Sequence, residues 1–209
     1  TKNSKLNLLS EGYPNKIKNK TTQKLYYVGD LMYDLFIKNQ NKLNKSLFKK
    51  KFNFINSNYG VITIHRKANL DNIKSLNIFL KKINKNYENL NFIFPIHPNT
   101  KRIFKKNKIK LEYKNIKFID PLSYINMQLL IKFSNLVVTD SGGLQKEAFF
   151  HNKNCIILRN ETEWSEIKIN NKIVNISNFN LNYLKFKKVI KDKKKLFGNA
   201  KSGKNILNI

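Results

Sequence analysis

Two apolar runs in this sequence end in residues that could bind an anion or move a proton. His65 and Arg66 follow the run "VITI", and His97 follows "NFIFPI". An imidazole in such a place can titrate near neutral pH or donate to a phosphate. Pro95 and Pro98 stiffen the turn around His97 and fix the direction of its ring. Taken alone, His65 is more often a satisfied polar residue at the end of a strand, and His97 is explained equally well by a structural turn.

A third run, "LVVTD", leads directly into Ser141, Gly142 and Gly143 and then into a helical pattern. Paired glycines let the backbone approach a ligand closely and tolerate positive φ. The helix that follows directs free N–H groups and its positive dipole end at the same place, which suits a phosphate. Ser141 can cap that helix or donate to a phosphate oxygen, and the Glu147 carboxylate can accept from a ribose diol. Because two glycines are not a P-loop, a plain helix start with a solvated glutamate stays open as the alternative.

Alternating strands and helices must position these residues. The predicted strands are mostly continuous apolar runs, which is typical of strands buried on both faces of a parallel sheet. They cover residues 24–29, 59–65, 91–97, 115–120, 135–140 and 154–159. Such an order predicts a doubly wound α/β domain, which binds ligands at the carboxyl ends of its strands.

Helical patterns lie between these runs. The clearest one places apolar side chains on a single face, namely Leu76, Phe79, Leu80, Ile83 and Tyr87. Two more helices are predicted over 123–133 and 143–151, and one or two peripheral helices over 176–209. We expect the charged, Asn-rich segment 38–58 to be the end of a helix and a solvated connection.

The composition excludes several classes of protein. The chain has 209 residues, 41% of them hydrophobic, so it can bury a core and is not globally disordered. It has no apolar run of about 18 residues that could span a membrane and no signal peptide at its start. It also has no initiator Met, as expected of a fragment or a processed piece. Its single cysteine, Cys155, excludes an internal disulfide framework and indicates a buried thiol.

The net charge of +28 allows two interpretations. One is a nucleic-acid-binding protein. The other is compositional drift, since Lys, Asn and Ile are over-used in every segment and arginine is confined to Arg66, Arg102 and Arg159. We favour drift, although the field could still attract anionic substrates.

Four motifs in this order resemble the carboxyl-terminal domain of the non-hydrolysing UDP-N-acetylglucosamine 2-epimerase family. They are "TIHRKANLDN", "FPIHPNT", "IDPLSYINM" and "VTDSGGLQKEAFFHNKNCIILRNETEW". The start of the chain, up to "YYVGDLMYDLF", is similar to the family's segment between its two domains, so the resemblance covers nearly the whole sequence. "VGDLMYD" and "RNETEWSE" resemble the branch acting on UDP-2,3-diacetamido-2,3-dideoxyglucuronate. The commoner branch has Arg-Pro where this chain has Trp164-Ser165, which removes a substrate contact or marks a different sugar.

The resemblance implies an architecture. It is a Rossmann-like doubly wound parallel sheet, the carboxyl-terminal half of a GT-B-like two-domain fold. Residues 1–40 would form the interdomain segment with a first strand and helix, 41–175 the UDP-binding domain and 176–209 the carboxyl-terminal helices. The family's amino-terminal catalytic domain is absent from this chain, and its acid/base carboxylates with it.

The resemblance also implies roles for the predicted site residues. Ser141, Gly142 and Gly143 would contact the diphosphate, and Glu147 the ribose hydroxyls. His65 would meet the diphosphate and assist the departure of UDP, which makes it the catalytic residue of this chain.

Uracil would lie near Pro121, Leu122 and Met127, where Met127 replaces a more usual aromatic residue. Arg66 and His97 would be structural or belong to a second nucleotide-sugar site. No metal and no redox cofactor is implied.

The family reaction removes the C2 proton of a UDP-sugar, expels UDP to leave a glycal-type intermediate and re-adds UDP after protonation of the other face. The implied partners are a UDP-sugar, the missing amino-terminal domain and a second copy of the chain in a homodimer. A membrane and nucleic acid are not implied, and the expected location is the cytoplasm. The product would serve cell-surface polysaccharides. The alternatives are a GT-B glycosyltransferase domain, a basic nucleic-acid-binding module and an inactive half-enzyme.

Overall fold

The structure is a computed structural model that describes residues 1–13, 16–17, 20–21, 24–55, 58–86, 90–180 and 193–209. The chain forms two compact units, Thr1–Asn41 with Ile190–Ile209, and Lys42–Val189. All of the predicted site residues lie in the second unit.

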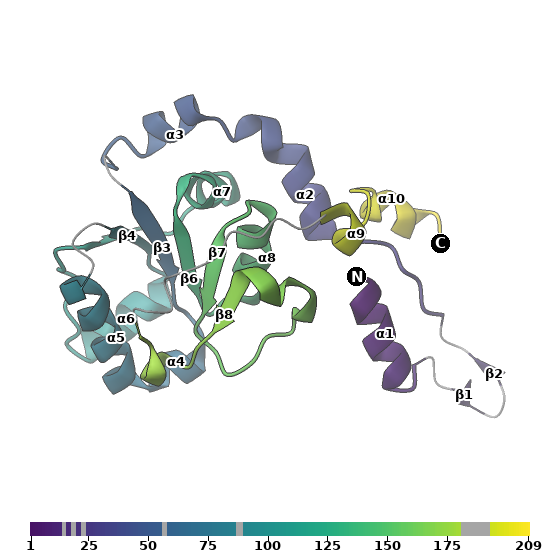
Figure 1. Ribbon diagram of the computed structural model, residues 1–209, viewed down its shortest axis with the longest axis horizontal. Helices are drawn as coiled ribbons and strands as arrows, with labels where there is room; N and C mark the ends of the chain where they lie inside the picture. Colours follow the sequence, from purple (N-terminus) through teal and green to yellow (C-terminus); the bar gives the residue numbers. More distant parts are fainter. Residues whose placement is uncertain (14–15, 18–19, 22–23, 56–57, 87–89, 181–192) are drawn as a thin grey trace. The chain divides into compact units, whose positions relative to one another are not determined.

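The second unit is built on a six-stranded sheet in which every neighbouring pair is parallel (Figure 1). Its strands are β3 (Tyr59–Thr63), β4 (Asn91–Pro95), β5 (Ile116–Ile119), β6 (Leu136–Thr139), β7 (Asn154–Ile157) and β8 (Asn171–Ile173). The order is β5-β4-β3-β6-β7-β8, so the chain builds outward from β3 to β5 and then crosses back to pair β6 with β3. This confirms the predicted doubly wound α/β fold, whose switch point lies between β3 and β6.

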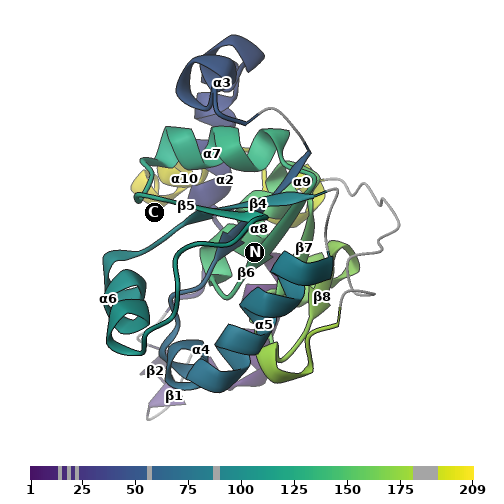
Figure 2. The ribbon, with the colours of Figure 1, turned by 90° about the vertical axis from the view of Figure 1, so that its left-hand side faces the viewer.

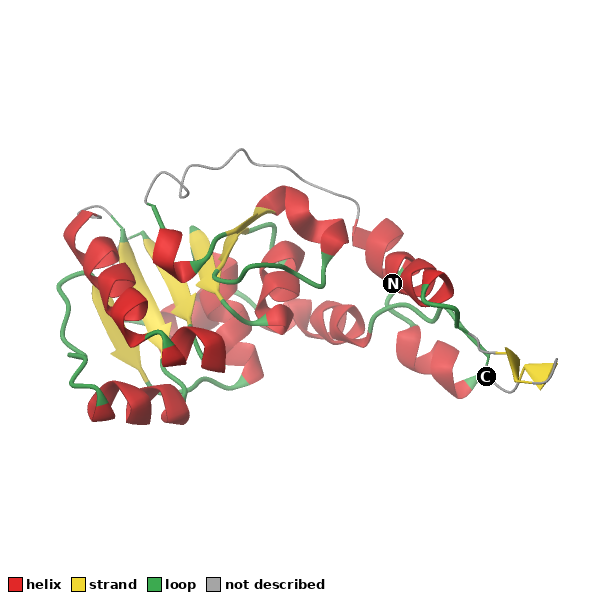
Figure 3. Cartoon of the chain, turned by 90° about the horizontal axis from the view of Figure 1, so that it is seen from below, coloured by secondary structure: helices red, strands yellow, loops and turns green. Residues whose placement is uncertain are grey.

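Helices cover both faces of this sheet, and Figure 2 shows α5 and α7 on opposite sides of it. Side chains of α4 (Lys67–Asp71), α5 (Ile73–Asn86) and α6 (Pro98–Lys106) pack into one core. Those of α3 (Lys45–Lys51), α7 (Tyr124–Phe133) and α8 (Gly142–Phe150) pack into the other. Figure 3 shows the strands side by side with the helices against them.

Alternate residues of each strand face opposite sides of the sheet, so each strand contributes side chains to both cores. Ile62 and Ile64 face the core on the α5 side, whereas Tyr59 and Val61 face the core on the α7 side. Both faces of each central strand must therefore be apolar, because neither face meets water. This explains the continuous apolar runs of the sequence.

The apolar face predicted for α5 is confirmed. Leu76, Phe79, Leu80 and Ile83 are fully buried, while Ile78 on the same helix is 52% exposed. Tyr87, the last residue predicted for this face, lies outside the described residues. The predicted helices 123–133 and 143–151 correspond to α7 and α8.

The prediction of a solvated connection over 38–58 was wrong. After α2 (Leu31–Asn39) and the 3-10 turn η1 (Gln40–Lys42), this stretch forms α3 and buries Leu43, Phe48 and Phe52 against the sheet. The Phe48 ring stacks on Tyr59 with centroids 6.1 Å apart. The exposed lysines of the last helical turn had masked this apolar face in the sequence.

The strand predicted at 24–29 was also wrong. These residues have no regular structure, and Tyr26 and Tyr27 are 49% and 36% exposed. A run with high β-propensity becomes a strand only where a partner strand and a packed face are available. The sequence reading missed the short strand β8, the helix α6 and the antiparallel pair β1 (Lys16–Ile17) and β2 (Lys20–Thr21).

The first unit is held by aromatic and polar contacts between its two chain segments. It contains α1 (Lys2–Ser10), α2, α9 (Lys193–Phe197) and α10 (Ser202–Leu207). Asp34 of α2 accepts from the Ser202 hydroxyl at 2.9 Å and from the Gly203 N–H at 3.1 Å, at the start of α10. Gly29 has φ of +102° and lies against Ser202, a position with no room for a side chain.

Residues beyond 175 belong partly to the sheet unit. The chain continues through the 3-10 turns η2 (Ser165–Asn170) and η3 (Ile176–Asn178). The side chains of Ile176, in η3, and Phe179, directly after it, pack into the core on the α5 side. The predicted domain limits of 41–175 and 176–209 stay predictions. Cys155 is fully buried as expected, and burial raises the pKa of its thiol. No helix among the described residues is long and apolar enough to cross a membrane.

Replacing Phe79 by alanine should lower the free energy of unfolding by about 3–5 kcal/mol, because the ring is fully buried and meets Phe179 edge-on at 4.8 Å. Ile78→Ala on the exposed face of the same helix is the matched control and should change stability by less than about 0.5 kcal/mol. Urea unfolding followed by circular dichroism measures both. Equal losses for the two variants would contradict the assigned helix face.

Candidate functional site

The candidate site lies at the switch point of the sheet, where β3 and β6 end side by side. Thr63 is in register with Thr139, and their hydroxyl oxygens lie 2.6 Å apart. His65 and Arg66 follow β3, and Asp140 follows β6. Open α/β sheets bind ligands at this kind of place, because the loops leave the two strands in opposite directions.

Asp140 joins the two strand ends, and sequence reasoning had given it no role. Its side chain is fully buried and accepts from the backbone N–H groups of His65 at 3.1 Å and Arg66 at 2.9 Å. Asn69 of α4 donates its amide to Asp140 at 3.1 Å and to the Leu158 carbonyl at 2.9 Å. The carboxylate therefore fixes the loop after β3 to the end of β6.

The His65 imidazole also pairs with Asp140, with Nδ1 3.2 Å from the carboxylate oxygen. This hydrogen bond raises the pKa of His65, assisted by the charge of Asp140 and opposed by burial and by the charge of Arg66. Burial alone would raise the pKa of Asp140, but the bonds from His65, Arg66 and Asn69 outweigh it and leave that pKa below its usual value. The pair thus favours an imidazolium beside a carboxylate.

A cavity of about 380 Å³ brings six of the residues predicted for the site together. They are His65, His97, Pro121, Leu122, Met127 and Ser141. The rings of His65 and His97 are 6.5 Å apart. The walls combine an apolar side from the loop before α7 with a polar side from the ends of β3, β4 and β6.

His97 has a second contact, which serves the backbone. It precedes α6, and its Nδ1 accepts from the Asn99 N–H at 3.2 Å as the helix cap. Its ring direction is thus fixed both by this bond and by Pro98 at the start of the helix.

Ser141, Gly142 and Gly143 form the start of α8. Ser141 is the N-cap, and its hydroxyl accepts from the Leu144 N–H at 3.3 Å, which leaves the hydroxyl proton available to a ligand. Neither glycine uses the positive φ that the sequence would permit. A Cβ atom at Gly142 would meet the Glu163 carboxylate, the end of a flexible side chain that would have to move aside.

Glu147 lies further along α8 and does not line the cavity. Burial raises its pKa to about 7, against the opposing effects of the Gln128 side chain and Lys146. Burial raises the pKa of the Tyr124 phenol to about 12, and the charge of Glu147 adds to this effect. A carboxyl group of this kind changes charge near neutral pH.

The segment after β7 closes over the start of α8. Glu163 forms ion pairs with Arg159 and, at 3.7 Å, with Arg66. The motif "RNETEW" had been noted in the sequence, but this bridging role of Glu163 had not. The scarcity of arginine was an available signal, since two of the few arginines in the chain meet at one carboxylate.

Trp164 and Thr162 complete this closure. The indole N–H of Trp164 donates to the Gly142 carbonyl at 2.9 Å, and the Lys146 ammonium lies 4.2 Å from the ring centroid. The Thr162 hydroxyl donates to the buried Gln145 side chain at 2.5 Å and accepts from the Trp164 N–H at 3.2 Å. The first turn of α8 is therefore held from outside by this segment.

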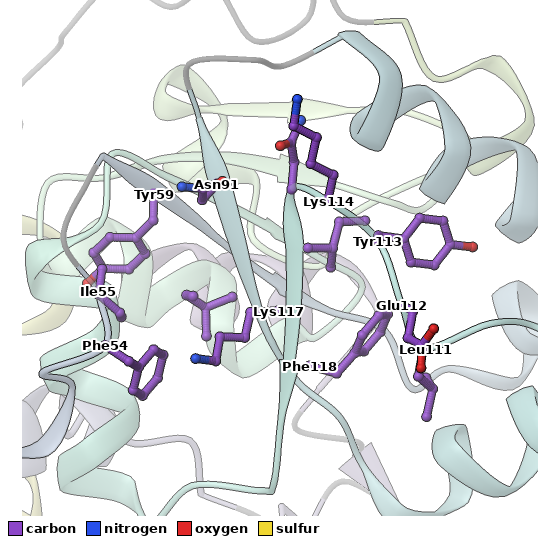
Figure 4. Close-up of a pocket in the computed structure, with 13 residues that line it drawn as sticks. Phe54, Ile55, Tyr59, Asn91, Leu111, Glu112, Tyr113, Lys114, Lys117 and Phe118 are labelled. Atoms are coloured by element: carbon purple, nitrogen blue, oxygen red, sulfur yellow. The ribbon is translucent and has the colours of Figure 1, made fainter.

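A larger cavity, of about 730 Å³, lies along strand β5 and does not contain the predicted residues. Figure 4 shows Phe54 and Lys117 on one wall, with the Lys117 ammonium 3.9 Å from the ring centroid, and Tyr113 on another. We therefore take the candidate site from the convergence of His65, His97 and Ser141 and not from the size of a cavity. Within the described ranges, no group of His, Cys, Asp or Glu side chains could hold a metal ion.

A family model described as UDP-N-acetylglucosamine 2-epimerase matches residues 1–209. The chain belongs to this family. A UDP-N-acetylglucosamine 2-epimerase of Methanococcus maripaludis is 35% identical, over 100% of this chain and 58% of its own length. A UDP-2,3-diacetamido-2,3-dideoxy-D-glucuronate 2-epimerase of Pseudomonas aeruginosa is also 35% identical, over 77% of this chain and 42% of its own length. The chain thus spans about half the length of the curated relatives it matches.

Solved structures of the family have the same fold. The UDP-GlcNAc 2-epimerase of Methanocaldococcus jannaschii, crystallised in complex with UDP-GlcNAc and UDP, aligns with a TM-score of 0.82 at 31% identity, over 100% of this chain and 58% of its own. The enzyme from Neisseria meningitidis bound to UDP-GlcNAc aligns with a TM-score of 0.78 at 26% identity, over 100% of this chain and 59% of its own. The predicted family and fold are confirmed.

Thr162→Val should lower the free energy of unfolding by about 1–3 kcal/mol, because the variant keeps the shape but leaves the buried Gln145 oxygen without its donor. Thr162→Ser keeps the hydroxyl and is the matched control, with a loss below about 1 kcal/mol. Urea unfolding monitored by Trp164, the single tryptophan, measures both. A valine variant as stable as the serine variant would show that the closure of residues 159–166 does not depend on this bond.

Proposed function

We propose that this chain is the UDP-holding part of a UDP-sugar 2-epimerase, an isomerase that inverts C2 by eliminating and re-adding UDP. The observation that carries the proposal is the convergence of His65, His97 and Ser141 on one cavity at the β3–β6 switch point, in a chain of this family. The same cavity has an apolar wall at Leu122 and Met127, as a nucleobase requires.

The diphosphate would lie at the start of α8. The N–H groups of the first helical turn have no partner within the helix, and the dipole adds positive potential there. Ser141 can donate its hydroxyl proton, and the His65 imidazolium adds a full charge from the facing strand end. These groups stabilise negative charge best when it is greatest, which is when the bond between the sugar and UDP breaks.

The ribose would extend toward Glu147, whose carboxylate accepts from the diol, with uracil against Leu122 and Met127. The proton transfers at C2 need an acid and a base on opposite faces of the sugar. We assign these to carboxylates in the part of the relatives' length that this chain does not span.

The relatives at 35% identity are named for two different UDP-2-acetamido sugars. We therefore propose this class of substrate. A location in the cytoplasm and a homodimer stay predictions.

The test uses a protein that contains this chain together with the remaining length of its relatives. In D2O it should catalyse the incorporation of deuterium at C2 of UDP-N-acetylglucosamine or of its diacetamido uronate analogue, without any sugar acceptor. His65→Gln should lower this rate roughly 100-fold, within the range seen for general acid–base groups. Lys105→Gln, which removes a cation on α6 outside the cavity, is the control and should retain the rate. Sugar transfer to an acceptor without deuterium exchange would instead indicate a glycosyltransferase.

UDP binding should depend on pH through Glu147. Since the diol donates to the ionised carboxylate, binding favours loss of the proton, and the contribution of Glu147 should appear as pH rises through about 7. We compare the UDP dissociation constant of Glu147→Gln with that of the unchanged chain. The ratio of the variant's constant to that of the unchanged chain should rise roughly tenfold between about pH 6 and pH 8. A hydrogen bond to a charged group, worth about 1.5 kcal/mol, gives a factor of this size.

Ionisation of UDP and of His65 affects the unchanged chain and the variant alike, so it cancels in the ratio. Titration calorimetry can measure both dissociation constants. The matched control is Glu112→Gln, on a wall of the β5 cavity. A ratio that stays constant over this pH range would remove Glu147 from the ribose site.

Equal affinity for UDP and for duplex DNA of the same phosphate concentration would favour the nucleic-acid alternative.

A further inference from the structure

The buried Asp140 carboxylate accepts more bonds than fixing a loop would need. Two backbone N–H groups and the Asn69 amide already hold the turn after β3. The contact with His65 Nδ1, at 3.2 Å, adds nothing to the path of the backbone. A buried charge is unfavourable unless several hydrogen-bond donors satisfy it, and Asp140 is fully buried. Losing any of these contacts would therefore lower the stability of the fold.

We propose that Asp140 is a positioning residue that fixes the tautomer and direction of the His65 imidazole, so that Nε2 is the nitrogen offered to the diphosphate. The inference rests on the proposed function for the identity of that ligand. It follows from the geometry that Nδ1 donates to Asp140, because an ionised carboxylate can only accept. The neutral ring then carries its proton on Nδ1, and a second proton can go only to Nε2.

The ring is 44% exposed and lines the cavity, whereas Asp140 is not exposed at all. The nitrogen that pairs with Asp140 is thus the one turned away from solvent. A proton gained at Nε2 can donate to an anion in the cavity, and its loss leaves a lone pair at the same place. One ring orientation therefore serves both binding of the diphosphate and its release.

The charged groups around His65 explain why a carboxylate is needed. Arg66 on its own turn disfavours a second positive charge, and the His97 ring is 6.5 Å away across the cavity. Glu163 is paired with Arg66 at 3.7 Å and Asp140 faces the ring directly. Without Asp140, burial and Arg66 would both act to keep His65 neutral near pH 7.

Asp140 is itself oriented by Asn69. This amide lies between the Asp140 carboxylate and the Leu158 carbonyl, at 3.1 and 2.9 Å, and so links the ends of β6 and β7 to α4. The carboxylate cannot rotate away from His65 without breaking that link. Asn69 therefore fixes the orientation of the Asp140 carboxylate without any bound ligand.

The imidazole NMR signals of the 209-residue chain test the proposal, because the chain has three histidines and His65→Gln assigns the signal of interest. In the unchanged protein above the His65 pKa, the nitrogen shifts should report a proton on Nδ1. A proton on Nε2 would overturn the proposal, and this measurement needs no variant at position 140.

Asp140→Asn should lower the midpoint of the His65 titration by about one pH unit or more, the effect of removing one adjacent opposite charge. Asp71→Asn, which removes an exposed carboxylate at the end of α4, is the matched control and should leave the midpoint in place. A folded Asp140→Asn protein with an unchanged midpoint would assign Asp140 a purely structural role. If this variant does not fold, the tautomer in the unchanged chain still decides.

UDP separates this inference from the proposed function. Between the His65 midpoints of the two proteins, Asp140→Asn should bind UDP at least about fivefold more weakly, and below both midpoints the two should converge. A change in tautomer and midpoint without any UDP binding would refute the proposed function and leave the pairing of Asp140 with His65 standing.

Discussion

The parallel pairing of β3 with β6 is the constraint on which the rest of this chain depends. It sets Thr63 against Thr139, and from that register the next residues of both strands meet at one point. The pairing is possible only because both strands are apolar on both faces, so that helices can cover the sheet on each side. The site is therefore a consequence of burial in the middle of the sheet and not of the loops alone.

The strongly basic composition is compatible with this fold because charge and burial are separated in space. The chain has 41 lysine and arginine residues, yet its two cores consist of apolar side chains. In α3 the lysines of the last turn are exposed while Phe48 of the same helix packs on the sheet. Lys146 is an exception, and its 3% exposure is compensated by the face of Trp164. The basic composition is thus compatible with the two apolar cores of the sheet unit.

The sequence was sufficient for those parts of the structure that follow from local patterns. The central strands, α5, α7, α8 and the grouping of His65 with Ser141 could be predicted, since continuous apolar runs and polar strand ends determine them. The apolar face of α3 was hidden by lysines, and the strand predicted at 24–29 lacked a partner. Asp140 stood in plain view at the end of "LVVTD", but its bonds reach back across more than seventy residues, to His65, Arg66 and Asn69. Only the three-dimensional pairing of strands can show such contacts.

Strand β5 forms one border of the sheet, with β4 as its neighbour in the order of strands. An edge strand presents unpaired backbone N–H and C=O groups to any other extended chain, and sheets associate with one another through such edges. Lys117 lies on β5, and its ammonium is 3.9 Å from the centroid of the Phe54 ring. A positive charge on an edge strand is one of the features that discourage its pairing with another chain, so Lys117 disfavours such pairing at this edge of the sheet.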